Sequence, residues 1–264
     1  MKRELVISTV FSNLSQTKIL AERCYTSTGI RSTIVCQLFE IAEQPFPNEY
    51  TTAYDIIYST EKGLAKSRML GVLSSSADLI WIADDDIEVV PDGAIEAFSL
   101  LEASDDDFIT TKYAINETDE RKRYSKLSFR HTTLSIMKVS SIEIMLKKPN
   151  VLDMGICFDT RFGLGAKYKS GEENIFLADI LSRGGKGKYL PITTSIHREL
   201  TSGGDFSNSL TNLSKGAIFK RVFGWWGLVI LFAFYIKKLL KKEIKVLQFF
   251  SCLVVSLKGF FQLK

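Results

Sequence analysis

Three consecutive aspartates, Asp84, Asp85 and Asp86, are the residues whose spacing most directly suggests chemistry. They follow the apolar run Leu79–Ala83. Adjacent carboxylates repel one another, so keeping them ionised requires a cation or a donor-rich ligand nearby. If the apolar run is a strand, alternation places Asp84 and Asp86 on one side and Asp85 on the other. The triplet would then present two carboxylates to a divalent ion and its phosphate ligand. The alternative is an acidic turn in which an aspartate caps a helix.

A second acidic group, Glu172 and Glu173, opens a predicted helix directly after Gly171. Acidic side chains in a first helical turn complement the helix dipole and need no other purpose. The functional alternative is a general base, because one carboxylate of an acidic pair can keep a raised pKa. Both interpretations stay open on these residues alone.

Two isolated side chains, His197 and Arg68, also have two interpretations. A lone histidine is usually structural, but at the end of a β-type run His197 could complete the coordination of a metal already held by aspartates. Arg68 lies on a predicted helix and is either a solvated charge or a contact to a nucleotide phosphate or base, which a planar guanidinium suits.

The elements that must position these residues alternate along the first half of the chain. The predicted strands are Leu5–Val10, Thr33–Phe39, Tyr54–Tyr58 and Leu79–Ala83, and the predicted helices are Gln16–Ser27, Glu61–Ser74 and Ala94–Ala103. Alternation with buried-looking strands indicates an α/β fold with a parallel sheet wrapped by helices. Ligands of such sheets bind beyond the carboxyl ends of the strands, which is where the aspartate triplet lies.

The second half is less regular. Predicted strands are Asp107–Ala114, Thr132–Met137, Lys188–Ile192 and Thr193–His197; predicted helices are Ser141–Lys147 and Glu172–Ser182; predicted loops are Gln44–Thr52, Gly163–Gly171 and the polar linker Ser202–Asn212. Composition makes Gly163–Gly171 a flexible loop, and its residues Gly163–Ser170 could order over a bound ligand and exclude water.

The C-terminal tail differs from the rest in charge and hydropathy. The chain of 264 residues has a net charge of +4, yet from Lys215 onward it carries ten Lys or Arg and one acid. The uncharged run Val222–Ile236 would be about 22 Å long as a helix, short of the roughly 30 Å of a bilayer core. A lysine cluster and a second apolar stretch, Val246–Leu257, follow it.

Lysines interleaved with long apolar runs favour a membrane surface over nucleic acid as the partner of this tail. We therefore expect helices lying in the plane of an anionic leaflet, with a core helix pair and a transmembrane pass as the alternatives. The four cysteines lack framework spacing, and the N-terminus lacks a signal-peptide pattern. These features predict a cytoplasmic protein that is peripherally attached to the cytoplasmic face of the cell membrane.

Four segments, in this order and spacing, resemble the family-2 glycosyltransferases of the GT-A fold, of the bacterial surface-polysaccharide type. They are EKGLAKSRMLGV (Glu61–Val72), IADDDIEVVPDG (Ile82–Gly93), FDTRFGLGAKYKSGEENIFLADILSRGGKGKYLP (Phe158–Pro191) and SIH (Ser195–His197). The resemblance covers about residues 3–200. It implies a Rossmann-like GT-A domain over 1–205, with a mixed, mainly parallel sheet flanked by helices, and a basic, apolar, membrane-associating helical tail over 206–264. Within the domain, 1–104 would bind the nucleotide sugar and 105–205 the acceptor.

The resemblance also implies roles by position. The aspartate triplet matches the family's DXD motif, so Asp86 is the expected metal ligand for Mn²⁺ or Mg²⁺, with His197 completing the metal site. Glu173 is the expected catalytic base and Glu172 its companion. The expected donor-binding residues are Thr9, Gln37, Arg68, Asp84 and Asp85, with Gln37 near the position where an aspartate often reads uracil.

The implied activity is inverting, metal-dependent transfer of a hexosyl or N-acetylhexosaminyl group. The donor would be a nucleotide-diphosphate sugar, UDP-linked by expectation. The acceptor would be a hydroxyl of a lipid-linked glycan or polysaccharide in cell-surface glycan biosynthesis. The alternatives are a sugar-1-phosphate nucleotidyltransferase and a non-catalytic membrane-surface protein that retains the fold.

Overall fold

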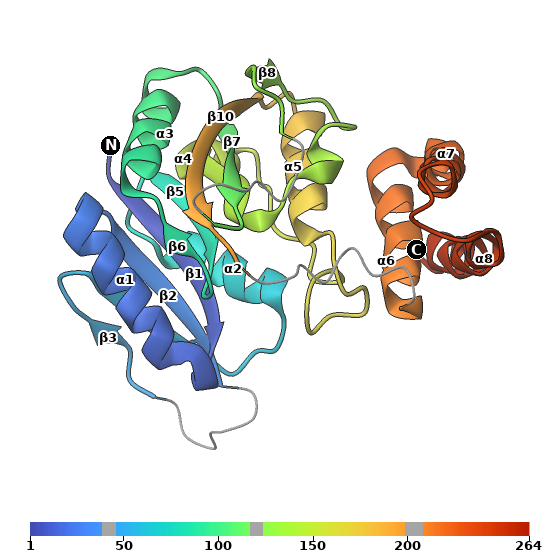
Figure 1. Ribbon diagram of the computed structural model, residues 1–264. Helices are drawn as coiled ribbons and strands as arrows, with labels where there is room; N and C mark the ends of the chain where they lie inside the picture. The colour runs from blue at the N-terminus through green and yellow to red at the C-terminus, as the bar shows by residue number, and fades with distance from the viewer. Residues whose placement is uncertain (39–45, 117–123, 199–207, 264) are drawn as a thin grey trace.

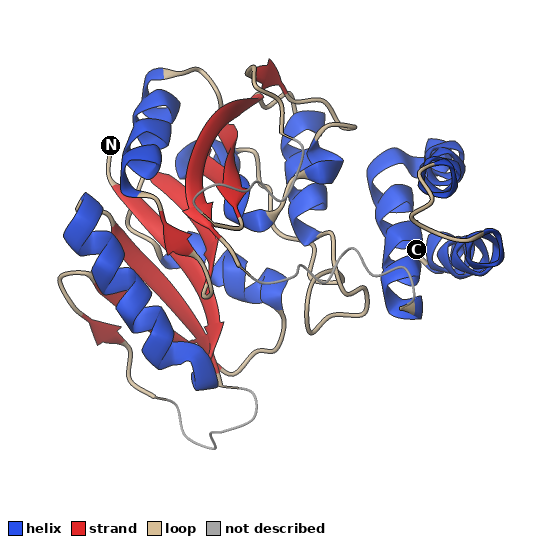
Figure 2. Cartoon of the chain, in the orientation of Figure 1, coloured by secondary structure: helices blue, strands red, loops and turns tan. Residues whose placement is uncertain are grey.

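The computed structural model describes residues 1–38, 46–116, 124–198 and 208–263 (Figure 1). Within these residues one mixed, mostly parallel sheet forms the centre of the molecule, with helices on both faces (Figure 2). Its strand order is β3-β4-β2-β1-β5-β9-β7-β10-β6, and β8 pairs with β10. A separate group of helices at the C-terminus lies beside α5 (Figure 1).

The first half of the chain confirms the predicted alternation. Its parallel strands are β1 (Arg3–Val10), β2 (Arg31–Gln37), β4 (Tyr54–Ser59) and β5 (Leu79–Asp84), and its helices are α1 (Leu14–Thr28), α2 (Leu64–Ser74) and α3 (Pro91–Ala103). Predicted strand residue Phe39 lies outside the described residues. Short elements complete this half: η1 (Phe11–Asn13), β3 (Glu49–Tyr50) and β6 (Glu88–Val89). The predicted loop Gln44–Thr52 therefore contains a two-residue edge strand, and its first two residues are not described.

Alternate side chains of the central strands enter two separate cores. On β1, Leu5 and Ile7 pack with α1 and α3, whereas Val6 packs with α2 on the opposite face. On β5, Trp81 and Ile82 divide in the same way. Both faces of these strands are thus buried, as expected of a parallel sheet covered by helices on each side.

The second half is built from β7 (Phe108–Ala114), β8 (Phe129–Arg130), η2 (Ile136–Lys138), η3 (Ser141–Glu143), β9 (Ile144–Lys147), α4 (Lys148–Asp153), α5 (Glu172–Ser182) and β10 (Gly187–Ile196). Strand β10 unites the two predicted strands around Pro191, and the irregular register between Tyr189 and Thr193 accommodates that proline.

Two predictions in this half are wrong. The predicted helix Ser141–Lys147 is a single 3-10 turn followed by β9, which runs antiparallel between β5 and β7. Its apolar residues are buried on both faces of the sheet, a pattern that a short helix shares. The predicted strand Thr132–Met137 forms turns instead, because Thr132 and Ser135 bond each other's backbone and replace a strand ladder.

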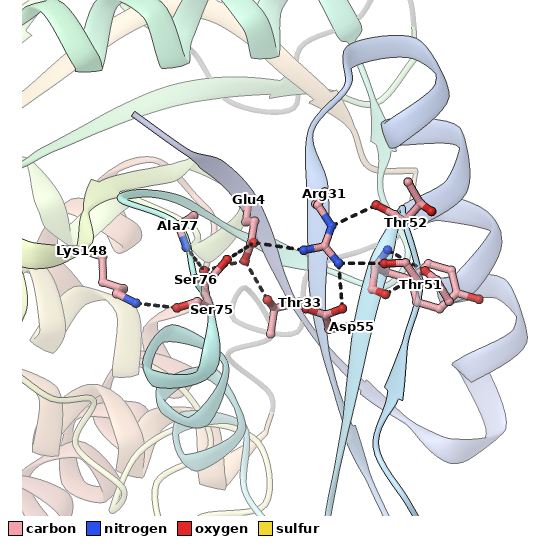
Figure 3. Close-up of polar contacts among 11 residues, drawn as sticks. Glu4, Arg31, Thr33, Thr51, Thr52, Asp55, Ser75, Ser76, Ala77 and Lys148 are labelled. Carbon is pink, nitrogen blue, oxygen red and sulfur yellow. Dashed lines mark hydrogen bonds and ion pairs between the residues drawn. The ribbon is translucent and has the colours of Figure 1, made fainter.

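A buried carboxylate, Glu4, organises the amino ends of the parallel strands (Figure 3). It accepts hydrogen bonds from Thr33 Oγ1 at 2.9 Å and from Ser75 Oγ at 2.6 Å, and a weaker one from Ser76. Arg31 lies 4.0 Å away and pairs mainly with Asp55. Both carboxylate oxygens of Glu4 therefore accept hydrogen bonds from protein side chains at this end of the sheet.

The C-terminal helical unit comprises α6 (Ser209–Phe223), η5 (Gly224–Trp226), α7 (Gly227–Leu240) and α8 (Val246–Gln262). The predicted linker Ser202–Asn212 is wrong for its last four residues, since Asn208 caps α6 by accepting a bond from Leu210 N. Its first six residues, and the predicted domain boundary at 205–206, lie outside the described residues. The apolar run Val222–Ile236 is also interrupted, at Gly224, whose φ is +59°.

Close contacts hold the three helices of this unit together. Gly216 and Gly259 lie where α6 and α8 meet: a Cβ at Gly216 would be 1.7 Å from Ser256 O, so these helices approach as only glycine permits. Buried polar groups then join all three helices, because Tyr235 Oη on α7 bonds Asn212 Oδ1 at 2.9 Å and Ser256 Oγ at 2.7 Å. The tail is therefore a packed unit with its own core.

Candidate functional site

A cavity of about 350 Å³ opens at the carboxyl ends of β1, β2 and β5. Its lining comes from three groups of residues: Ser8, Thr9, Val10, Asn13 and Gln37 at the ends of β1 and β2; Lys62, Gly63, Leu64, Leu164 and Gly165 from two loops; and Asp84, Asp85 and Asp86 after β5. All three aspartates line it. Strand β5 ends at Asp84 and the next two residues form a turn, and each of the three side chains has a different partner.

Asp85 is held by the turn that follows β1. Thr9 Oγ1 donates to Asp85 Oδ2 at 2.5 Å, and Asn13 Nδ2 donates to the same oxygen at 3.2 Å. Thr17 of α1 fixes Thr9 in turn, with a 3.0 Å bond between their hydroxyls. Burial raises the pKa of the Asp85 carboxyl, while the bonds from Thr9 and Asn13 lower it and the neighbouring aspartates raise it.

Asp84 is the half-buried end of a chain of charges that continues into the interior. Arg68 on α2 is only 2 % exposed, and its guanidinium donates to Asp84 Oδ1 at 2.7 Å and to Glu172 Oε1 at 2.6 Å. The two carboxylates keep the pKa of Arg68 raised despite the opposing effect of burial. Arg68 thus links the end of β5 to the start of α5, and it does not line the cavity, where a nucleotide contact was expected.

Asp86 meets His197 across the sheet. His197 Nε2 lies 3.0 Å from Asp86 Oδ2, and the backbone N–H of His197 bonds Ala114 O at 2.8 Å. The short strand β6 pairs with the end of β10, and this pairing carries the residues after the triplet to His197, 111 positions later in the chain. Asp86 offers carboxylate oxygens, which Mn²⁺ and Mg²⁺ both prefer, and His197 offers an imidazole nitrogen, which suits Mn²⁺ better than Mg²⁺.

Among the described residues no three His, Cys, Asp or Glu side chains converge on one point. The Asp86–His197 pair still fits an ion of this kind, because Mg²⁺ is usually held by one or two carboxylates plus substrate phosphates. Asp86 is well exposed toward the cavity, so it could reach an ion that a diphosphate brings with it.

The loop Gly163–Gly171 closes one wall of the cavity. Leu64 N donates to Leu164 O at 2.9 Å, and a Cβ at Gly165 would lie 3.1 Å from Gly63 Cα. Gln37 Oε1 accepts from Gly63 N at 3.0 Å, so Gln37 is used to hold this wall. The loop predicted to cover a ligand therefore lies against the cavity.

Glu172 and Glu173 occupy different environments although they are adjacent. Glu172 is 4 % exposed and bonded to Arg68, with its second oxygen buried against Gly163. Glu173 is half-buried, and burial together with the charge of Glu172 raises its pKa to about 8, against the lowering effects of Arg68 and Lys215. A carboxyl with such a pKa suits proton transfer near neutral pH.

The structure thus places Thr9, Gln37 and the three aspartates on the cavity, with His197 beside Asp86. Arg68 and Glu172 lie behind the wall as an ion pair. Sequence reasoning missed Ser8, Asn13 and Lys62, which also line the cavity. The sequence offered a signal for Asn13, because it follows β1 in the same way that the aspartates follow β5.

Comparisons with known proteins give the fold. No protein-family model and no curated protein sequence matches the chain. Solved structures of Staphylococcus aureus TarS, a family-2-like glycosyltransferase, do match. TarS 1–349 in complex with UDP-GlcNAc matches with a TM-score of 0.62 and 13% identity, over 98% of this chain and 82% of that one. A longer TarS structure matches with a TM-score of 0.63 and 12% identity, over 98% of this chain and 49% of that one.

At this identity the likeness shows a shared fold. The match extends over nearly the whole chain and so includes the C-terminal helices. Structures of TarS with UDP and with UDP-GlcNAc are among those that match.

Proposed function

We propose that this protein is an inverting, metal-dependent glycosyltransferase that takes a hexosyl or N-acetylhexosaminyl group from a nucleotide-diphosphate sugar. The observation that carries the proposal is the cavity at the carboxyl ends of the parallel strands, which three carboxylates line. Its support is the fold shared with TarS, which binds UDP-GlcNAc. We favour a UDP-linked donor for the same reason.

The donor would occupy the cavity with its base over the ends of β1 and β2. Ser8 Oγ is buried there and has no hydrogen-bond partner among the described residues, so it can serve the base or ribose. Lys62 also lines the cavity and would supply a cation for the diphosphate. Asp84 and Asp85 would accept from ribose hydroxyls, and Asp86 with His197 would hold the metal.

A bound Mn²⁺ or Mg²⁺ would neutralise the charge that develops on the leaving diphosphate. Glu173 would take the proton from the acceptor hydroxyl as that oxygen attacks the sugar. A single displacement inverts the anomeric carbon. Glu172 would keep the first turn of α5 in place through its ion pair with Arg68.

The test is a panel of nucleotide sugars with Mn²⁺, scored for nucleoside diphosphate release and for thermal stabilisation of the protein. We expect one UDP-sugar to be turned over, and EDTA to stop turnover. Release of pyrophosphate instead would identify a sugar-1-phosphate nucleotidyltransferase. Neither product, together with no metal-dependent stabilisation, would favour a non-catalytic protein that retains the fold.

The acceptor is proposed to be a lipid-linked glycan or polysaccharide, presented at the cytoplasmic face of the membrane. The support is the outer face of the C-terminal helical unit, where large apolar side chains are exposed: Trp225, Trp226, Val229, Phe232, Ile236, Leu240, Val246, Leu247, Phe250, Val254 and Phe261. Exposed lysines lie where α7 turns into α8: Lys237, Lys241, Lys242 and Lys245. Apolar side chains bordered by lysines suit the interface of an anionic leaflet.

Taken as one stretch, Ser209–Leu240 is long and apolar enough to cross a membrane. An in-plane position is favoured here, because α6 is packed against the catalytic domain and the helix breaks at Gly224. Helix α7 alone has fourteen residues, or about 21 Å, which is shorter than a bilayer core of about 30 Å.

Sedimentation with phosphatidylglycerol-containing vesicles tests this placement. We expect binding that high salt weakens and that the double variant Lys241→Glu/Lys242→Glu abolishes. A matched double variant on the catalytic domain, Lys2→Glu/Lys126→Glu, should bind like the parent. Binding that resists both salt and the tail substitutions would contradict in-plane attachment and favour a membrane-spanning helix.

A further inference from the structure

The loop Gly163–Gly171 lies between α2 and α6 and is closed at its base (Figure 1). The base is formed by Phe162 and Tyr168, which pair as an isolated β-bridge and stack their rings with centroids 4.9 Å apart. The backbone N–H of Tyr168 also donates to Arg161 O at 3.0 Å. Because the chain returns to its starting point within a few residues, the base and the tip of the loop form one compact piece.

The tip of this loop belongs to the proposed donor cavity. Leu164 and Gly165 are among the residues that line the cavity. Leu64 N donates to Leu164 O at 2.9 Å, and a Cβ at Gly165 would lie 3.1 Å from Gly63 Cα. A displacement of the tip would therefore change the shape of the cavity.

The base of the loop belongs to a different core, which it shares with α6. The rings of Phe162 and Tyr168 are fully buried. They lie in a cluster whose other buried members come from α5 and α6: Ile175, Ala217 and Ile218. Separating the loop from α6 would expose both rings to water, so the apolar contact keeps the base in place.

Two close contacts fix the chain between the base and α5. Ser214 Oγ accepts from the backbone N–H of Lys169 at 2.8 Å. The Ser214 hydroxyl donates in turn to Leu210 O at 2.8 Å, one turn earlier on α6, which leaves its oxygen to accept. Gly171 has a φ of +98°, and a Cβ there would lie 2.3 Å from Ile218 Cδ1, so the backbone rests directly on α6.

Helix α6 is itself held firmly enough to act as a support. At its C-terminal end Arg221 donates to both oxygens of Asp179 on α5, at 3.0 and 2.8 Å. It also donates to Asp159, just before the loop, at 3.1 Å. A bidentate arginine pair fixes orientation as well as distance, so α6 keeps its place relative to α5 and the loop.

We propose that α6 holds the loop Gly163–Gly171 against the donor cavity, with Ser214 and Ile218 as positioning residues for this wall. The C-terminal helical unit then contributes to nucleotide-sugar binding through the loop, although none of its described residues lines the cavity. This contribution does not depend on a membrane. The inference rests on the proposed function, because that function assigns the cavity to the donor.

The experiment measures the Kd for UDP with Mn²⁺ by calorimetry, and hydrogen exchange of the loop amides without nucleotide, in the parent, Ser214→Ala and Ile218→Ala. We expect both variants to speed exchange across the loop. Ser214→Ala should raise the Kd by about 2- to 10-fold, as expected for one lost hydrogen bond. Ile218→Ala should raise it further, because it opens a cavity under Gly171.

Leu231→Ala is the matched control, since Leu231 is as deeply buried as Ile218 but lies on α7 in the core of the helical unit. It should keep the parental Kd and loop exchange. Steady-state kinetics add a second criterion: Ser214→Ala should raise donor KM and leave kcat unchanged, because it loosens the wall without touching a reacting group.

Thermal denaturation establishes that each variant is folded. A parental Kd in folded Ser214→Ala and Ile218→Ala, or an equal rise in Leu231→Ala, would overturn this inference and leave the proposed function standing. Absence of UDP binding by the parent chain would instead overturn the proposed function, and the role of the wall with it.

Discussion

The two ends of the parallel strands both carry buried or half-buried carboxylates, and they use them in opposite ways. At the amino ends, Glu4 is surrounded by hydroxyl donors that satisfy its carboxylate (Figure 3). At the carboxyl ends, three aspartates face a cavity and share only a few donors. The sheet therefore uses one set of carboxylates for its own stability and keeps the other available for a ligand.

This difference helps to distinguish carboxylates with a structural role from carboxylates that can bind a ligand. A carboxylate whose oxygens already accept hydrogen bonds from the protein gains little stabilisation from a ligand. Carboxylates placed side by side are costly until a cation or donor arrives. Asp84 combines the two cases. Arg68 donates a hydrogen bond to its carboxylate, and the residue still lines the cavity.

The largest expected effect is at Asp86. We expect Asp86→Ala to lower kcat/KM by about 1000-fold or more, because the metal's stabilisation of the leaving diphosphate is worth several kcal/mol. Folding should be unaffected or slightly improved, as one of three adjacent like charges is removed. Steady-state assays with thermal denaturation check both parts. Near-parental activity would show that Asp86 is not a metal ligand.

Glu173→Gln should come next, lowering kcat by about 100- to 10,000-fold while donor binding is retained. In the parent chain the base must be ionised, and its pKa is raised to about 8 by burial and by Glu172. We therefore expect kcat to increase as pH rises toward 8 and to level off above it. If Glu173→Gln keeps both turnover and this limb, Glu172 becomes the candidate base.

Arg68→Met tests the link between the two sides of the site. Removing the guanidinium leaves Glu172 buried without its cation, which should cost about 3–5 kcal/mol of unfolding free energy. Urea denaturation measures this cost, and Lys66→Met, an exposed lysine on the same helix, is the control. A loss below about 1 kcal/mol, as for surface ion pairs, would show that the pair is not buried in solution.

The smallest effect is predicted at the amino ends of the strands. Glu4→Gln should cost about 1–3 kcal/mol of stability, because hydroxyls that donate to the carboxylate lose a charged acceptor. Its kcat and donor KM should equal those of the parent. An activity change in a stably folded Glu4→Gln protein would contradict a purely structural role for the carboxylate at the amino ends of the strands.

Much of the first half of the chain could be predicted from the sequence, because its longer strands carry mostly apolar runs that end in polar residues. The Asp84–Asp86 triplet was found in this way. Strand β9 was missed, since four residues with three buried apolar side chains have no period that separates strand from helix. Chain connectivity gave no hint that this segment lies between β5 and β7.

The partners of the site residues were harder to predict. Arg68 and Glu172 are 104 positions apart, and an arginine in a helical pattern gives no sign of which carboxylates it will meet. The packing of α6 on α5 was missed for a related reason. The tail differs in composition from the residues before it, and its contacts with Gly171 and Asp179 depend on packing rather than on any local motif.

The most direct test of the central claim is isothermal titration calorimetry of UDP-sugars into the parent chain and Asp86→Ala, with Mn²⁺ and with EDTA. We predict saturable binding to the parent that Mn²⁺ strengthens, and no Mn²⁺ effect in Asp86→Ala. Binding that is identical in all four conditions, or absent with every donor, would contradict a metal-assisted nucleotide-sugar site at the carboxyl ends of the strands.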